Sequence, residues 1–92
     1  IPPAAWHLAL EEIVAADEHL PATLVVDVTE MIWLVGQDWG FLLRLGDRLA
    51  RGANRLAVVA AERIVRAGTT IGLDERIRLG TSMDEALGYE AN

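Results

Sequence analysis

A chain of 92 residues with 52% hydrophobic and 24% charged residues has the composition of one small globular domain. Its formal net charge of −6 opposes non-specific binding to nucleic acid and to anionic lipid, and the absence of cysteine excludes disulfides and thiolate chemistry. Apolar stretches such as residues 31–35 are far shorter than the roughly 20 residues that span a bilayer. The sequence opens with Ile-Pro-Pro and shows no basic region of a signal peptide, so we expect none. We therefore expect a single cytoplasmic domain over residues 1–92 that inserts into no membrane.

Residues 4–18 are predicted to form an amphipathic helix. Its apolar stripe consists of Trp6, Leu10, Ile13 and Val14. The two histidines of the chain, His7 and His19, would lie about 18 Å apart along this helix. This distance excludes a shared metal ion, so we expect both histidines to be solvated surface side chains.

Two apolar runs follow the first helix. Residues 24–28 are β-branched without polar alternation, which is typical of a strand covered on both faces in a parallel sheet. Residues 31–35 are predicted to be a short strand or a buried connector, with Trp33 in the core. Asp27 is charged and lies near the end of the first strand. It either faces the loops where α/β proteins bind ligands or accepts backbone amides of the following turn.

The second half of the chain continues the alternation of helices and strands. The pattern predicts a helix over 38–51, a strand over 55–60, a helix around 64–71, an edge strand over 76–79, and a final helix with a capping box over 82–85. Helices between apolar strands indicate parallel strands joined by right-handed crossovers. The predicted fold class is therefore α/β, a small, mostly parallel sheet with helices packed against it.

Residues able to carry out catalysis are few. Ser82 is the only serine and fits best as a helix cap, so no Ser-His-Asp arrangement is indicated. The adjacent carboxylates at 11–12, 74–75 and 84–85 would point about 100° apart on a helix and do not converge as an acid and base pair. We predict no catalytic residue, no metal site and no cofactor.

The segment 36–40, Gly-Gln-Asp-Trp-Gly, lies between an apolar run and a helix start, as a phosphate-binding loop does. It lacks the lysine and the Ser/Thr of such loops, and the carboxylate of Asp38 would repel an anion. A small nucleotide-binding α/β protein stays an alternative. Trp39, at the start of the helix, is a candidate anchor for a protein partner.

Arginines form a strip along the helix predicted over 38–51. Arg44, Arg48 and Arg51 follow helical spacing, and Arg55 extends the strip. We expect intramolecular ion pairs such as Asp47 with Arg51 to neutralise it, with ligand binding as the alternative.

Five segments follow one another in a characteristic order. They are Asp27-Val28-Thr29 after the first strand, Trp33-Leu34 in the next apolar run, the leucine-rich helix ending at Arg51-Gly52, Ile71-Gly72-Leu73-Asp74-Glu75, and Met83-Asp84-Glu85-Ala86-Leu87. In this order and spacing they resemble the STAS domain, the module of bacterial anti-sigma-factor antagonists and of sulfate-transporter tails. The resemblance covers residues 24–87.

The chain departs from the STAS pattern in two places. The signature Asp-Ser-Ser-Gly becomes Val-Gly-Gln-Asp over 35–38, so that Gly36 replaces the serine that anti-sigma kinases phosphorylate. Glycine has no hydroxyl, which excludes phosphorylation at this position. The given sequence also starts at the family's first helix, so the two strands that precede this helix in the family are missing or supplied otherwise. The exposed sheet edge would be a place to pair with another chain, including a second copy in a homodimer.

The resemblance implies a non-catalytic protein-interaction module, not switched by phosphorylation at the usual serine. Its expected partner is an anti-sigma kinase-like protein. The alternative within the family is an accessory subunit or domain of a lipid or anion transporter. By position, the expected partner-binding residues are Gln37, Asp38 and Trp39 beside Gly36, together with Asp27 and Arg44. Asp38 is predicted to act there as a fixed negative charge, and the sequence leaves open whether Thr29 is modified.

Overall fold

The computed structural model describes residues 4–16 and 22–88. In chain order they form α1 (Ala5–Ala16), β1 (Thr23–Asp27), α2 (Gly36–Arg51), β2 (Arg55–Val59), α3 (Glu62–Thr70), the 3₁₀ turn η1 (Leu73–Glu75), β3 (Arg78–Gly80) and α4 (Met83–Leu87). The predicted α/β fold class is confirmed. No helix within the described ranges is both long and apolar enough to cross a bilayer.

The three strands form one parallel sheet in the order β1-β2-β3. Val25 of β1 lies opposite Ala57 of β2, and Val58 of β2 lies opposite Leu79 of β3. The edge strand expected over 76–79 begins two residues later than predicted, because Arg76 and Ile77 still belong to the turn after η1.

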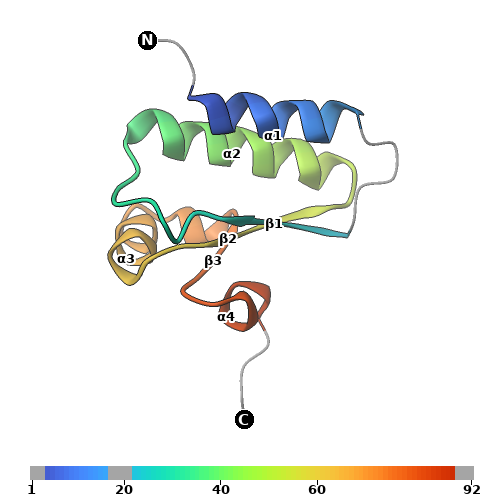
Figure 1. Ribbon diagram of the computed structural model, residues 1–92. Coiled ribbons are helices and arrows are strands. Elements are labelled where there is room, and N and C mark those ends of the chain that lie inside the picture. The colour runs from blue at the N-terminus through green and yellow to red at the C-terminus, as the bar shows by residue number, and fades with distance from the viewer. Residues whose placement is uncertain (1–3, 17–21, 89–92) are drawn as a thin grey trace.

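Helices cover both faces of the sheet (Figure 1). The larger core lies on the face of α1 and α2 and includes Leu56 and Val58 of β2. The smaller core lies on the face of α4 and includes Ala57 and Val59. The side chains of β2 thus alternate between two apolar cores, which explains why this strand carries no polar alternation.

Helix α1 packs against the rest of the fold through a slightly different face from the one predicted. Trp6, Leu10 and Val14 contact the core as expected, but Ile13 is half-exposed. His7 takes its place and is only 2% exposed, so its prediction as a solvated side chain is wrong. The physical reason is that His7, Leu10 and Val14 follow helical spacing and so share the face of α1 that turns toward the core. His19 lies outside the described residues.

The connection from β1 to α2 is neither a strand nor a buried connector. Leu34 is 1% exposed, whereas its neighbours Ile32, Trp33 and Val35 project into solvent. Helix α2 begins at Gly36, two residues before the predicted start. The run of five apolar residues therefore contributes only Leu34 and the half-buried Met31 to the core.

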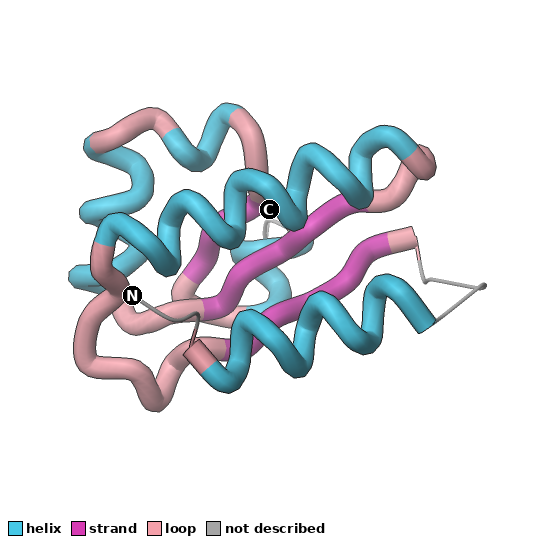
Figure 2. The backbone as a smooth tube through the Cα atoms, turned by 90° about the horizontal axis from the view of Figure 1, so that it is seen from above, coloured by secondary structure: helices cyan, strands magenta, loops and turns pink. Residues whose placement is uncertain are grey.

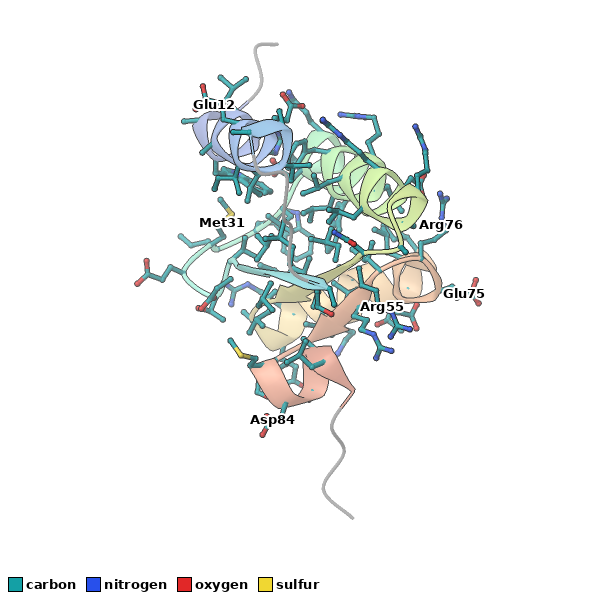
Figure 3. The ribbon with its side chains drawn as sticks, turned by 90° about the vertical axis from the view of Figure 1, so that its right-hand side faces the viewer. Glu12, Met31, Arg55, Glu75, Arg76 and Asp84 are labelled. Carbon is teal, nitrogen blue, oxygen red and sulfur yellow. The ribbon has the colours of Figure 1, made fainter. Side chains whose placement is uncertain are left out.

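The charged side chains that Figure 3 labels lie at the surface of the domain, among them Glu12, Glu75 and Asp84. Met31 instead extends from the loop toward α1 (Figure 3). On the other side of α2, a Cβ at Gly46 would come within 2.6 Å of Ile77 Cγ2. This close approach brings α2 against the turn that leads into β3.

Candidate functional site

Most of the predicted site residues lie at the start of α2, whereas Asp27 lies at the end of β1 and Arg44 lies farther along α2. Asp27 is the last residue of β1, and Gly36, Gln37, Asp38 and Trp39 form the first turn of α2. Gly36 and Gln37 are exposed, and a Cβ at Gly36 would meet open space.

Asp27 is tied into the turn that follows its strand. Its Oδ1 accepts hydrogen bonds from the Thr29 hydroxyl at 2.7 Å and from the Thr29 backbone N–H at 2.9 Å. Both bonds favour the carboxylate and hold the pKa of Asp27 below its ordinary value, with the hydroxyl making the larger contribution. The sequence left two roles open for Asp27, and in the structure it accepts a backbone amide of the following turn. The hydroxyl of Thr29 serves as a donor in this turn.

Asp38 has both carboxylate oxygens engaged within the chain. Oδ1 lies 2.8 Å from Nε2 of His7, and Oδ2 accepts the backbone N–H of Val35 at 2.9 Å. Val35 is the residue that caps α2, so Asp38 satisfies a backbone donor that the helix leaves free and places a negative charge at its positive end. The fixed charge predicted for Asp38 thus serves the start of the helix first.

The imidazole of His7 lies between the first two helices. Its ring stacks on Phe41 of α2 with centroids 4.2 Å apart, and the ring of Trp6 meets it edge-on. The hydrogen bond to Asp38 satisfies the one ring nitrogen that faces α2. His7, Asp38 and Val35 therefore form a continuous link from α1 to the loop before α2, which we call the His7–Asp38 clip.

The clip has the residue types of a catalytic pair, but its imidazole is buried and both oxygens of its carboxylate accept hydrogen bonds within the chain. Ser82, the only serine, accepts the N–H of Glu85 as the cap of α4, as predicted. Within residues 4–16 and 22–88, no three His, Cys, Asp or Glu side chains lie close enough together to hold a metal ion. We therefore assign the clip a structural role.

The two tryptophans near this site exchange their predicted places. Trp39, expected as a surface anchor, is buried: its indole lies against α3, where a Cβ at Gly68 would approach it to 3.1 Å. Trp33, expected in the core, is 53% exposed. The reason is that Trp39 shares the helical face of Leu42 and Leu49, whereas Trp33 lies in irregular chain.

Three exposed apolar side chains lie close together in this loop. Ile32 is 79% and Val35 57% exposed, and with Trp33 they form what we call the apolar loop, residues 32–35. Its backbone is fixed from both sides: Arg63 Nε of α3 donates to the Ile32 carbonyl at 2.7 Å, and the Val35 N–H donates to Asp38. Sequence reasoning missed this surface because an uninterrupted apolar run usually indicates core.

The arginine strip is not neutralised as predicted. Arg44, Arg48, Arg51 and Arg55 are exposed, and among the described side chains no carboxylate forms an ion pair with them. Asp47, predicted to pair with Arg51, instead contacts Arg76 at 2.6 Å. The turn after η1 brings Arg76 to Asp47, which a prediction from one helix alone cannot anticipate.

No protein-family model matches the chain, and no curated protein matches it.

Proposed function

We propose that this chain is a non-catalytic protein-interaction domain of the STAS type, which docks a partner through the apolar loop and the first turn of α2. The observation that carries the proposal is the exposure of Ile32, Trp33 and Val35 within four consecutive positions. Exposed apolar side chains that gather in one place mark interaction sites more often than scattered ones do.

The loop has the properties of a hot spot. Tryptophan is enriched among the residues that dominate binding energy, and Trp33 stands between two aliphatic side chains that can exclude water around it. The hydrogen bonds from Arg63 and to Asp38 already order the backbone. A partner therefore loses little free energy to the ordering of this loop.

The chemistry at Gly36 makes this binding constitutive. A phosphate on a side chain at this position would add about −1.5 to −2 charges beside the apolar loop. Glycine offers no hydroxyl to receive it, and the carboxylate of Asp38, in the same helical turn, already bonds His7 and Val35. The partner class that the resemblance implies is an anti-sigma kinase-like protein.

The test is calorimetric titration of the domain with an anti-sigma kinase-like protein from the same genome. Trp33→Ala should weaken binding by about 30-fold or more, as expected for a tryptophan hot spot. Met83→Ala is the matched control, because Met83 is equally exposed but lies on α4, across the sheet. Equal affinity of the wild type and the Trp33 variant would refute docking through the apolar loop.

A further inference from the structure

The outer edge of β1 is open. The Ala22 carbonyl accepts the N–H of Arg55, and the Val28 N–H donates to the Val59 carbonyl. The even-numbered residues from 22 to 28 therefore direct their backbone N–H and C=O groups toward β2. Because successive residues of a strand alternate in direction, the N–H and C=O groups of Thr23, Val25 and Asp27 point away from the sheet. Within the described ranges no backbone group pairs with them.

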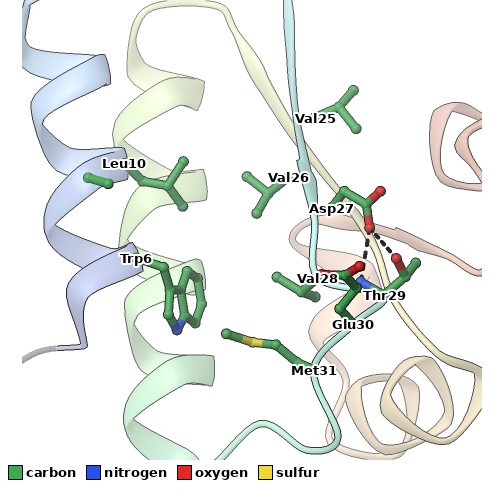
Figure 4. A pocket seen from close by; sticks show the side chains of 10 residues that line it. Trp6, Leu10, Val25, Val26, Asp27, Val28, Thr29, Glu30 and Met31 are labelled. Atoms are coloured by element: carbon green, nitrogen blue, oxygen red, sulfur yellow. Dashed lines mark hydrogen bonds between the residues drawn. The ribbon is translucent and has the colours of Figure 1, made fainter.

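An apolar groove runs along this edge. Viewed from above, α1 follows the outer side of β1 (Figure 2). Trp6, Ala9 and Leu10 of α1 form one wall of the groove, and Val26 and Met31 belong to the other. Figure 4 shows Trp6 and Met31 facing each other across it, and its volume is about 580 Å³. The helix thus covers a space beside the strand that no described segment fills.

The open edge of β1 carries an acidic side chain on the face of the sheet opposite α1. Val26 belongs to the core under α1, and Val25 packs with the core of α4, so Asp27, two residues on, also projects toward the α4 face. Only one of its carboxylate oxygens accepts the hydrogen bonds of Thr29. The other oxygen has no hydrogen-bond partner among the described residues, and Glu30 also lines the groove.

We propose that this edge binds an extended segment of another polypeptide as a fourth strand. Its backbone would pair with the outward groups of Thr23, Val25 and Asp27, as in other complexes formed by strand addition. Alternate side chains would be apolar and enter the groove under α1. A side chain between them would be basic and would face Asp27, because opposite charges on paired strands attract.

The geometry favours a lone strand over a second copy of this chain. Edges of two copies meet in an antiparallel pair about a two-fold axis perpendicular to the sheet, which places both α1 helices on the same face. Each α1 already overhangs its own free edge, so the two helices would compete for one space. An extended peptide brings no such helix.

The experiment uses the ¹⁵N-labelled domain and synthetic heptapeptides with valine at alternate positions, threonine between them, and one arginine opposite Asp27. Binding should slow hydrogen exchange at the amides of Val25 and Asp27 by about tenfold or more at saturation, since these amides gain partners. The amides of Leu24 and Val26 already face β2 and should not change. No change at the outward amides up to the solubility limit of the peptide would overturn the proposal. Slower exchange of these amides as the protein concentration rises, without peptide, would also overturn the proposal, because it would mean that a second copy of the chain pairs with this edge.

Two pairs of variants test the groove and the charge separately. Ala9→Trp should fill the groove and weaken peptide binding about tenfold, whereas Ala15→Trp, on the exposed side of the same helix and outside the groove, should not.

Replacing the peptide arginine with glutamate should weaken binding about fivefold at low salt. Asp27→Asn should abolish this preference, and Asp84→Asn, on α4, should retain it. Trp33→Ala should leave peptide binding unchanged, because the apolar loop is a separate site. Wild-type peptide affinity of the Ala9→Trp variant would refute binding in the groove.

Discussion

Two connections leave the same end of the sheet, and only one of them is longer than the fold needs. Residues 28–35 join β1 to α2, whereas residues 60 and 61 suffice to join β2 to α3. Both begin alike: the N–H of Val28 donates to Val59, and the N–H of Ala60 donates to Gly80 on the next strand. Both first residues are buried.

Beyond these first residues the two connections differ. The short connection turns directly into α3, while the long one exposes the apolar loop before α2 begins. Arg63, at the start of α3, donates to Ile32 and so ties the long connection to that helix. The needs of the fold explain a link as short as residues 60 and 61, and they explain the burial of Leu34 in the long connection. They do not explain three exposed apolar side chains held on an ordered backbone, which is why we assign them to binding.

The sharpest test of this comparison separates Leu34 from its neighbours. Leu34→Ala should lower the free energy of unfolding by about 2–5 kcal/mol, because it empties a fully buried site. Ile32→Ala should change it by no more than about 0.5 kcal/mol, since that side chain is in solvent. Urea unfolding followed by circular dichroism measures both. Similar losses for the two variants would mean that the loop belongs to the core.

The next largest effect concerns the clip that fixes the far end of the loop. Asp38→Ala removes the partner of the buried His7 nitrogen and of the Val35 N–H together. We expect a loss of about 1–3 kcal/mol in stability, mainly the cost of leaving the buried His7 nitrogen unpaired. Faster hydrogen exchange along α1 should accompany it, because the clip joins this helix to α2.

Asp47→Ala is the control for this loss. Asp47 also forms an ion pair, with Arg76, but both side chains are about half exposed, and a surface pair contributes at most about 1 kcal/mol. Equal effects of the two alanine variants would show that burial of His7 adds nothing to the clip.

A smaller effect is expected at the hydrogen bond from Arg63 of α3 to the Ile32 carbonyl of the long connection. Arg63→Ala should cost about 0.5–1.5 kcal/mol by removing one hydrogen bond, and it should speed exchange of the amides in residues 31–35. Arg66→Ala, on the same helix, removes an exposed ion pair with Glu62 and should leave the loop amides unchanged. Loop exchange that does not distinguish these variants would contradict the role of Arg63.

Most of the fold could be predicted because its elements carry local signals. The runs that became β1 and β2 lack polar alternation, which is what burial on both faces requires, and the parallel order followed from the helices between them. The cap of α4 at Ser82 followed from its spacing to Glu85. Each of these signals lies within a few residues of the element that it specifies.

The site was harder because burial there depends on partners distant in sequence. His7 and Trp39 both lie on the apolar stripes of their helices, so the signal existed but was outweighed by residue type and by position at a helix start. Exposure of Trp33 had no local signal at all. It depends on where Arg63 and Asp38 hold the loop, 30 and five residues away in the chain.

The smallest expected effect lies at the first turn of the long connection. Thr29→Ala removes the hydroxyl that contributes most to the low pKa of Asp27 and keeps the backbone N–H, so the pKa should rise only part of the way to its ordinary value. A carboxyl whose pKa is lowered by folding stabilises the folded state above its unfolded pKa, and this contribution disappears as the pH falls through the folded pKa. The variant should therefore lose less stability on acidification than the wild type. NMR titration of the Asp27 carboxyl carbon measures the shift, with Thr81→Ala, whose hydroxyl contacts Glu85 instead, as the control. A pKa that Thr29→Ala leaves unmoved would mean that the backbone bond alone orders this turn, and that the entry of the chain into the apolar loop does not depend on the threonine side chain.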